Sequence, residues 1–397
     1  MRDTILLCGG FELDRNGASA LRALSIAKLY ERIGYRVVVL GKFDTAPGTR
    51  ANGGHERLLQ GVTCRDIRQP CPGRTPRFYP VSAEAIDDVA RTTGTHRVRA
   101  IQFYNYPARG LVAGLHLCRR IGAAPILDCT EWPRWEGRRF RRNLYRRAGI
   151  ETRMRALTRV AGNVICASDW FRGRLPRQHT IRLPFVLDTA RPEWMKAPLP
   201  TRFDAPARFI YSGSPGVGMA KDRLPLIIDA LDSLASENLA FQCDILGITR
   251  DEYLRDAPQH RRAIERLAGE VRFHGRVSHA TSLDMLRRAD FSVFFRKPDR
   301  VAHTGFATKF VEAHTLGIPV VTNATSDIPR YLTDGKNGFL APGIAPDQIA
   351  GALRDAVTLS PTGRQEMRRV CLAQNAFEMD LWQRDASRFL DGLRGLA

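Results

Sequence analysis

The sequence has no uninterrupted apolar run that approaches the ~18 residues a membrane-spanning helix needs. Its first residues, MRDTILLCGGFELD, hold only a short apolar stretch before charged residues begin. This pattern predicts a first β-strand rather than a secretion signal. We therefore expect a cytoplasmic protein.

Several metal-binding patterns are also missing. There is no C-x-x-C pair among the eight cysteines, no H-E-x-x-H and no D-x-D. The apolar surroundings of Cys8, Cys166 and Cys243 predict reduced, buried thiols. We expect no zinc site, no cofactor and no carboxylate pair that grips a metal-bound diphosphate.

Acidic residues are few relative to basic ones. The 397 residues contain 61 Lys and Arg against 41 Asp and Glu, which gives a formal net charge of +20. The segment from Arg134 to Arg159 is rich in arginine and includes Trp135, Phe140 and Tyr145. It indicates either a solvated helix face or a surface that lies on an anionic membrane, which would add peripheral contact with the inner face of the plasma membrane. Charge alone would also suit nucleic acid, but no nucleic-acid-binding module is recognisable and no specific nucleic acid is expected.

Strand and helix patterns alternate along most of the chain. The pattern stops after Asp188 in a proline-rich stretch and then restarts, which predicts an α/β protein with two Rossmann-like domains facing a cleft. A final amphipathic helix is expected to cross back to the first domain. The expected boundaries are 1–190 for the first domain, 191–206 for the linker, 207–375 for the second domain and 376–397 for the C-terminal helix.

The stretch HTGFATKFVEAHTLGIPVVTN predicts a loop, a helix and a buried strand. A helix that begins near Phe306 or Ala307 points unpaired backbone N–H groups and its positive dipole end toward a ligand. Thr308 and Glu312 are four residues apart and share a face, where a carboxylate can accept hydrogen bonds from a ribose diol. Gly317 ends the helix. The alternative is an ordinary amphipathic helix with a surface glutamate.

Small and polar residues also follow other predicted strands, where ligands of doubly wound sheets bind. The glycine-rich loop Tyr211–Asp222 contains Lys221 and suits a phosphate, although it lacks the P-loop spacing and a plain turn remains the alternative. In the first domain, polar residues occur at the start of the first helix and after two strands. These acceptor-side candidates are Gly17, Ala18, Asn105, Asp128 and Glu131.

The second domain resembles the family 4 glycosyltransferases of the GT-B fold, most of all bacterial enzymes of exopolysaccharide and lipopolysaccharide assembly. The resemblance covers most of residues 207–341, and its most specific part is GFATKFVEAHTLGIPVVTNATSDIPRYLTDGKNGFL. The first domain is similar more loosely. The family implies a nucleotide-diphosphate sugar donor, retention of anomeric configuration and no required metal.

The resemblance also implies roles for single residues. Glu312 matches the ribose-binding glutamate, Lys221 the lysine that neutralises the diphosphate, and Gly17 the glycine of the N-terminal loop. The implied donor-binding residues are Gly213, Ser214, Lys221, Arg276, Val277, Gly305, Phe306, Ala307, Thr308, Lys309 and Glu312. The catalytic candidates are Lys221, Glu312, Thr304 and His303.

Two positions depart from the family pattern. Many members carry a glutamate eight residues before the ribose-binding one, where this chain has Thr304. An arginine often found after the first strand of the second domain is replaced by Ser214, and Arg223, Lys297 or Lys309 could supply the missing charge.

The resemblance predicts a retaining, metal-independent glycosyltransferase of bacterial polysaccharide or glycoconjugate assembly, with a sugar, a lipid-linked sugar or a small molecule as acceptor. The alternatives are glycosylation of a secondary metabolite, a non-catalytic binder of nucleotide sugars and a sugar-nucleotide epimerase. An epimerase would need acid and base side chains around the sugar, which the motif does not indicate. Donor hydrolysis or transfer would separate an enzyme from a binder.

Overall fold

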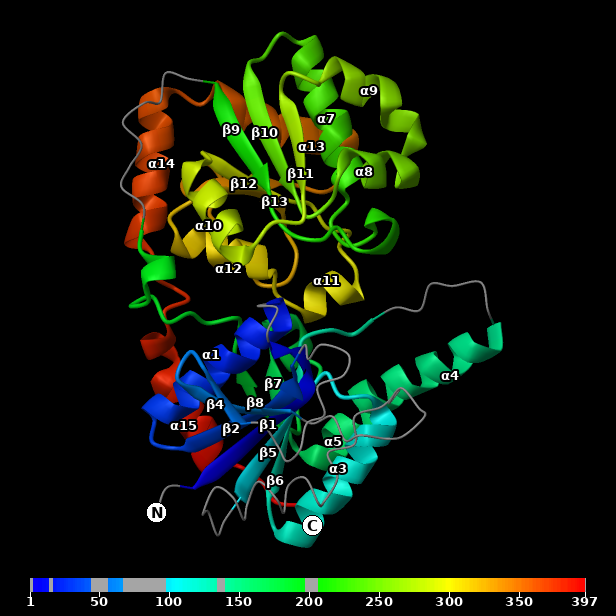
Figure 1. Ribbon diagram of the computed structural model, residues 1–397, viewed down its shortest axis with the longest axis vertical. Coiled ribbons are helices and arrows are strands. Elements are labelled where there is room, and N and C mark those ends of the chain that lie inside the picture. Colours follow the sequence, from blue (N-terminus) through cyan, green and yellow to red (C-terminus); the bar gives the residue numbers. More distant parts are fainter. Residues whose placement is uncertain are drawn as a thin grey trace. The chain divides into compact units, whose positions relative to one another are not determined.

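The chain folds into two compact units, each built around its own sheet (Figure 1). The computed structural model describes residues 3–13, 17–43, 56–66, 98–133, 140–196 and 206–396. The first unit contains Met1–Leu187, Thr304–Phe306 and Met379–Ala397. The second unit contains Asp188–His303 and Ala307–Glu378.

The first unit has an eight-stranded sheet with the strand order β3-β4-β2-β1-β5-β6-β7-β8. All neighbouring strands are parallel except β3 and β4. From β4 to β7 the order is that of a Rossmann sheet, with its reversal between β1 and β5. The strands are β1 (Thr4–Glu12), β2 (Arg36–Lys42), β3 (Glu56–Leu59), β4 (Val62–Asp66), β5 (Val98–Tyr104), β6 (Ala124–Cys129), β7 (Asn163–Cys166) and β8 (His179–Arg182).

Both faces of this sheet are buried, which explains why β1 is apolar without alternation. Ile5 and Leu7 of β1 belong to one core, and Leu6 and Cys8 belong to the other. The described cysteines all have free, buried thiols. Among the described residues, the helical segments of the unit are α1 (Ala18–Arg32), α3 (Ala108–Ile121), α4 (Phe140–Glu151), the π-helix η2 (Thr152–Leu157), α5 (Thr158–Ala161), α6 (Asp169–Arg172), η7 (Met379–Trp382) and α15 (Gln383–Asp391).

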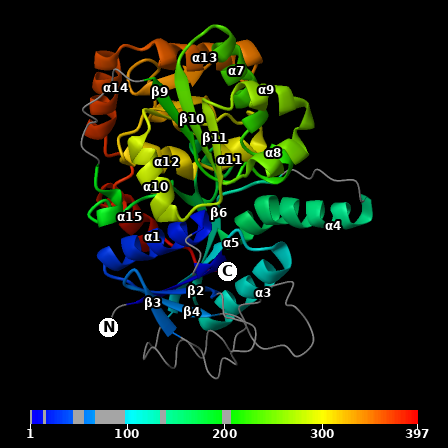
Figure 2. The same cartoon turned by 45° about the horizontal axis from the view of Figure 1, so that its top comes forward.

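The last helix, α15, packs beside α1 on one face of the first sheet (Figures 1 and 2). Phe389 and Leu390 share a core with Ile26 and Leu29 of α1. The ring of His179 on β8 stacks on Phe389 at 4.9 Å between centroids. The C-terminal helix therefore completes the core of the first unit.

The second unit has a six-stranded parallel sheet with the order β11-β10-β9-β12-β13-β14. This is again the Rossmann order, and the reversal lies between β9 and β12. The strands are β9 (Ala207–Tyr211), β10 (Phe241–Leu246), β11 (Val271–Gly275), β12 (Phe291–Val293), β13 (Val320–Asn323) and β14 (Gly338–Ala341). Its α-helices are α7 (Leu224–Ser236), α8 (Arg250–Asp256), α9 (Arg261–Arg266), α10 (His279–Arg288), α12 (Thr308–Thr315), α13 (Pro346–Thr358) and α14 (Pro361–Ala373), while α11 (Arg300–Thr304) ends at a residue of the first unit.

The predicted fold class is confirmed in its elements. Two Rossmann-like sheets are present, and the C-terminal helix returns to the first of them. The first helix, α1, turns an apolar face toward the sheet, because Ile26, Leu29 and Tyr30 are buried and Ile33 packs against them.

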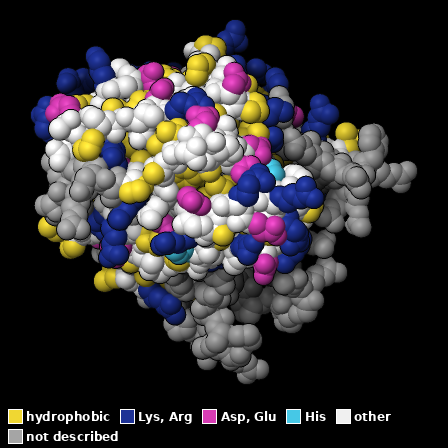
Figure 3. All heavy atoms as spheres, turned by 90° about the horizontal axis from the view of Figure 1, so that it is seen from above, with side chains coloured by type: hydrophobic (Ala, Val, Ile, Leu, Met, Phe, Trp, Pro, Cys, Tyr) yellow, Lys and Arg dark blue, Asp and Glu magenta, His cyan; other side chains and the backbone are white. Residues whose placement is uncertain are grey.

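On the face seen in Figure 3, Lys and Arg side chains occur over much of the surface, with Asp and Glu side chains among them. No helix in the described part of the chain is both long enough and apolar enough to cross a membrane.

Candidate functional site

The carboxyl edge of the second sheet brings together most of the donor-side residues predicted from the sequence. The loop after β9 begins at Ser212, and the order reverses between β9 and β12. In doubly wound sheets this reversal opens the crevice in which ligands bind.

The loop after β9 is shaped by glycines in backbone conformations that other residues rarely adopt. Gly213 has φ of +112° and Gly216 has φ of +84°. The Lys221 N–H donates to Pro215 O over 3.0 Å, and a Cβ on Gly216 would lie 2.9 Å from Cβ of Lys221. The loop thus folds back on itself, with Ser214 and Lys221 exposed on it.

Strands β10 and β11 both end beside this loop. A Cβ on Gly247 would lie 2.5 Å from Gly213 O. Only a glycine at position 247 therefore lets the chain after β10 come this close to the glycine loop. The Gly247 N–H donates to Gly275 O over 2.7 Å, which brings the start of the β11 loop to the same edge. Arg276, exposed, and Val277, half-buried, follow there. Their predicted role beside the base stays a prediction.

The last residue of the glycine loop, Asp222, has a buried carboxylate. Asp222 accepts hydrogen bonds from Nζ of Lys309 (2.7 Å), Nε of Arg296 (2.7 Å) and the Tyr211 hydroxyl (3.0 Å). Nζ of Lys309 also lies 3.9 Å from the centroid of the Tyr211 ring. Burial alone would raise the pKa of Asp222, but Lys309 and Arg296 outweigh it and hold the pKa below its usual range. Burial lowers the pKa of Lys309 to about 8, against the opposing charge of Asp222.

Helix α12 begins at Thr308, one or two residues later than the sequence suggested. Ala307 precedes it with extended backbone. Lys309 is buried, and Glu312 is half-buried rather than on an open surface. Oε1 of Glu312 lies 3.1 Å from Nε2 of His279, the first residue of α10.

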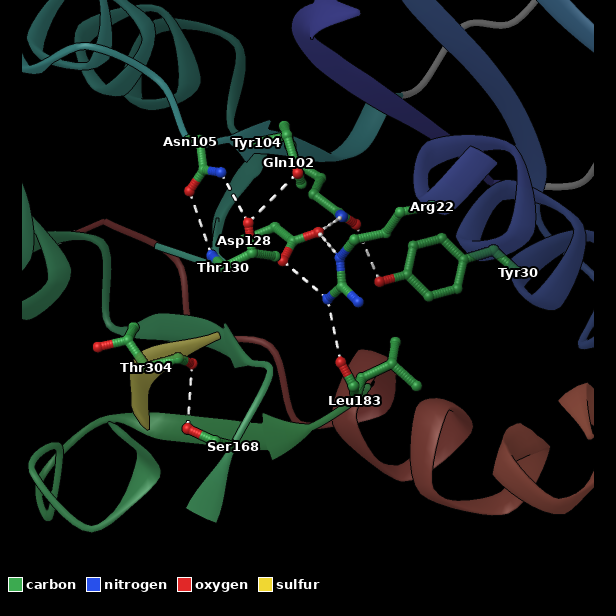
Figure 4. Close-up of polar contacts among 10 residues, drawn as sticks. All are labelled: Arg22, Tyr30, Gln102, Tyr104, Asn105, Asp128, Thr130, Ser168, Leu183 and Thr304. Carbon is green, nitrogen blue, oxygen red and sulfur yellow. Dashed lines mark hydrogen bonds and ion pairs between the residues drawn. The ribbon is translucent and has the colours of Figure 1, made fainter. Parts of the chain in front are cut away.

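The residues before α12 divide between the two units. His303 lies in the second unit, where its Nδ1 accepts a hydrogen bond from the Ser326 N–H (3.2 Å). Thr304, which is fully buried, belongs to the first unit, and its carbonyl accepts a hydrogen bond from the Ser168 hydroxyl (3.0 Å) (Figure 4). Gly305 and Phe306 belong to the first unit as well. The four catalytic candidates therefore do not form one cluster within either unit.

In the first unit, a buried polar network lies where the strand order reverses, as Figure 4 shows. Arg22 of α1 donates to both carboxylate oxygens of Asp128, over 3.2 and 2.9 Å, and to Leu183 O over 3.0 Å. Gln102 donates to Asp128 over 3.2 Å and accepts from the Tyr30 hydroxyl over 3.0 Å. Asp128 is only 1% exposed, so its carboxylate is enclosed by Arg22 and Gln102 and is not open to an acceptor as the sequence suggested.

The loops after β5 and β6 are tied together above this network. Asn105, with φ of +43°, donates to Thr130 Oγ1 (2.7 Å) and accepts from the Thr130 N–H (3.1 Å). Arg153 of the π-helix donates to Asn105 O (3.0 Å) and Glu131 O (2.9 Å). Asn105 is half-buried and Glu131 is exposed, so these two acceptor-side candidates lie close together.

Gly17 and Ala18 open α1, as expected, with Gly17 in extended backbone before the helix.

The basic segment of 134–159 is only partly described, because residues 134–139 and the side chains of 140–143 and 145 lie outside the described residues. Within the described part, Arg146 and Arg147 are exposed but Arg153 is buried. The segment is therefore not uniformly a solvated face.

Several residues of these sites were not singled out from the sequence, among them Arg22, Gln102, Asp222 and Arg296. Asp222 follows Lys221 directly, and a lone acid at the end of a glycine-rich loop was a usable signal.

Among the described residues, no three His, Cys, Asp or Glu side chains are placed to hold a metal ion.

Two Rossmann-like units of this order, with a C-terminal helix that completes the first, make up the GT-B fold of glycosyltransferases. HepE from Anabaena, in a crystal structure with UDP and glucose, has this fold and is similar with a TM-score of 0.67 and 17% identity, over 98% of this chain and 99% of that one. The profile described as Glycosyl transferases group 1 matches residues 207–358. That part of the chain is similar to this family, and the resemblance predicted from the sequence is confirmed.

Curated relatives match over shorter stretches. D-inositol 3-phosphate glycosyltransferase of Paenarthrobacter aurescens is 33% identical over 109 residues, which is 26% of each chain. Phosphatidyl-myo-inositol mannosyltransferase of Mycobacterium tuberculosis is 32% identical over 143 residues, 36% of this chain and 34% of the relative. The match thus spans about a quarter to a third of these relatives' length.

Proposed function

We propose that the chain is a retaining glycosyltransferase that moves a sugar from a nucleotide-diphosphate sugar to an acceptor hydroxyl in bacterial polysaccharide or glycoconjugate assembly. The observation that carries this proposal is the family match of residues 207–358, within which the glycine loop, Arg276 and the start of α12 occupy one edge of a Rossmann sheet. UDP and glucose in the crystal structure of HepE support a nucleotide sugar as donor.

In this proposal the second unit binds the donor and the first unit binds the acceptor. The first domain would be 1–190, joined through 191–206 to the donor domain 207–375, with 376–397 returning to the first. Donor contacts would come from Lys221, from Glu312 at the ribose and from the N–H groups that open α12. Acceptor contacts would come from the loops that carry Asn105 and Glu131, and a sugar, a lipid-linked sugar or a small molecule could be the acceptor.

The chemistry needs two contributions from such residues. Negative charge builds on the leaving diphosphate, and fixed cations and helix N-termini stabilise it. The acceptor hydroxyl must be positioned on the face from which the diphosphate departs, and the leaving phosphate can then take its proton. Neither a protein nucleophile nor a metal ion is required by this route.

We further propose that the protein acts in the cytoplasm, with peripheral contact between the 134–159 segment and an anionic membrane. Exposed Arg146 and Arg147 on α4, beside exposed Leu144, support this contact. A mannosyltransferase relative whose name includes a phosphatidyl lipid also supports a lipid-linked acceptor.

A thermal-shift screen with UDP, GDP, dTDP and ADP tests the donor class, because a ligand that binds only the folded state raises the unfolding midpoint. We expect one of the four to stabilise the protein well above the others. Hydrolysis of the matching nucleotide sugar then separates an enzyme from a non-catalytic binder of nucleotide sugars. The binder is the alternative that the two departures from the family pattern, Thr304 and Ser214, would favour. No stabilisation by any of the four would overturn the proposal.

A further inference from the structure

The buried cluster around Asp222 contains more positive than negative charge. Two cations, Lys309 and Arg296, face a single carboxylate whose side chain is 1% exposed. Their own side chains are 8% and 11% exposed. A charge removed from water is costly unless an opposite charge compensates it, so a surplus cation at this depth favours an anionic ligand.

Arg296 is held in place through both its backbone and its side chain. Its backbone N–H donates to Asn323 Oδ1 over 2.9 Å, and its carbonyl accepts from Asn323 Nδ2 over 2.8 Å. Its side chain uses Nε for Asp222. Nη1 and Nη2 have no hydrogen-bond partner among the residues that the structure describes, and neither is fully enclosed. The part of the guanidinium that binds anions in a fork is therefore fixed and available.

The position of Arg296 in the fold matches a ligand site. It lies three residues beyond the end of β12, while Asp222 follows the loop of β9, so the pair spans the two strands at which the order reverses. The same loop carries Ser214 where many family members have an arginine. A cation that follows β12 would thus take the place of the arginine that the β9 loop lacks, in addition to Lys221 of that loop.

We propose that Arg296, oriented by Asp222, is a diphosphate-binding residue of this protein and supplies the charge that Ser214 lacks. This inference rests on the proposed donor site and adds a specific residue to it. Asp222 and Asn323 are positioning residues, since they act through Arg296. Lys309, on the other side of Asp222, completes the positive surface beneath the glycine loop.

The opposing explanation is that Arg296 only neutralises Asp222. A purely structural pair would affect unfolding, but it would not distinguish a diphosphate from a monophosphate. The two explanations therefore differ in ligand selectivity.

Calorimetric titration of the full chain tests this difference. The probes are inorganic pyrophosphate, the nucleoside diphosphate chosen by the thermal-shift screen, and its monophosphate. In Arg296→Gln we expect affinity for pyrophosphate and diphosphate to fall roughly tenfold or more, as for loss of hydrogen bonds to a charged group. Affinity for the monophosphate, which lacks the second phosphate, should fall much less.

The matched control is Arg208→Gln, which removes the same charge from an exposed side chain on β9 at the opposite end of the sheet. It should bind all three probes as the unmodified protein does. Equal losses in both variants would reduce the effect to net charge and overturn the proposal. Arg296→Lys keeps the charge without the fork, so it should bind pyrophosphate with intermediate affinity, and it carries the test if Arg296→Gln does not fold.

The outcomes for the two proposals are separable. Unchanged diphosphate affinity in folded Arg296→Gln overturns the role of Arg296 and leaves the proposed function standing. If the unmodified protein binds pyrophosphate through Arg296 but binds no nucleotide, the anion site stands and the proposed donor class fails. Wild-type affinity in Arg296→Lys would overturn the requirement for the bidentate fork.

Discussion

Nε2 of His279 lies 3.1 Å from Oε1 of Glu312, and this contact joins the first residue of α10 to the middle of α12. The carboxylate predicted to bind ribose thus has a protein partner, the imidazole of His279. The side chain of Glu312 is 12% exposed and that of His279 is 24% exposed, so the contact is largely shielded from solvent.

Glu312→Gln should weaken binding of the preferred nucleoside diphosphate by roughly 1.5–3 kcal/mol, the usual value of hydrogen bonds to a charged group. Calorimetric titration measures the change. Glu265→Gln, an exposed residue of α9, is the control and should bind normally. Unchanged affinity in folded Glu312→Gln would assign the carboxylate to a structural contact with His279 alone.

Transfer activity should survive chelation. The sequence lacks D-x-D, and the cations beneath the glycine loop offer charge that a metal would otherwise supply. The measurement is transfer with and without EDTA. A large loss that Mg²⁺ or Mn²⁺ restores would refute metal independence.

Diphosphate affinity should fall as the pH rises past about 8, because the pKa of Lys309 is lowered to about 8 by burial. Stability should move in the opposite direction. The ordinary pKa of this lysine is 10.5, so between about 8 and 10.5 the unfolded chain binds more protons than the folded one, and the contribution of Lys309 to the free energy of unfolding rises with pH. Titrations across this range, repeated with Lys309→Gln, check both signs. A fall of the same size in the variant would assign it to another group.

Arg22→Met should destabilise the first unit by roughly 3–5 kcal/mol, because it leaves the buried carboxylate of Asp128 without its cation. Arg32→Met on the same helix is the control. Arg32 pairs with Asp380 at the surface, and such pairs are worth about 1 kcal/mol or less. Denaturant unfolding compares the two, and equal effects would show that the buried pair has no special weight.

Binding to anionic vesicles should depend on the 134–159 segment, since each basic side chain near such a surface is worth about 1 kcal/mol. Co-sedimentation at physiological salt compares two fourfold arginine-to-serine variants. The test variant changes Arg138, Arg139, Arg141 and Arg142. The control changes four exposed arginines of α8 and the start of α9, namely Arg250, Arg255, Arg261 and Arg262. Equal binding by the two variants would reduce the segment to a solvated surface.

The strands and helices could be predicted because burial imposes a local, repeated pattern on the sequence. A strand buried on both faces, such as β1, is a continuous apolar run, and a helix such as α1 has one apolar face. The position of the glycine loop could be predicted for the same reason, since it directly follows a recognisable strand. The partners of Asp222 could not, because Arg296 and Lys309 lie 74 and 87 residues away. Arg22 and Asp128 are separated by 106 residues, so nothing local marks either as the other's counter-ion.

Lys309 shows the limit of reasoning from a helix pattern. Its place near the start of α12 suggested contact with a phosphate, but a helix phase does not reveal that the side chain turns beneath Gly213 toward a carboxylate. The expected direct contact of Asp128 with an acceptor had the same weakness. A strand end locates a residue at the right edge without showing how deep its side chain lies.

The return of α15 to the first sheet has a consequence for biosynthesis. The second unit is made from residues that follow one another closely, and its sheet can be completed once β14 has been synthesised. The first unit begins earlier but lacks Phe389 and Leu390 in its core until translation has passed the second unit and reached α15. During translation the unit that starts first is thus the one that finishes last, and a nascent chain halted before α15 would expose the apolar surface of α1 to chaperones and proteases.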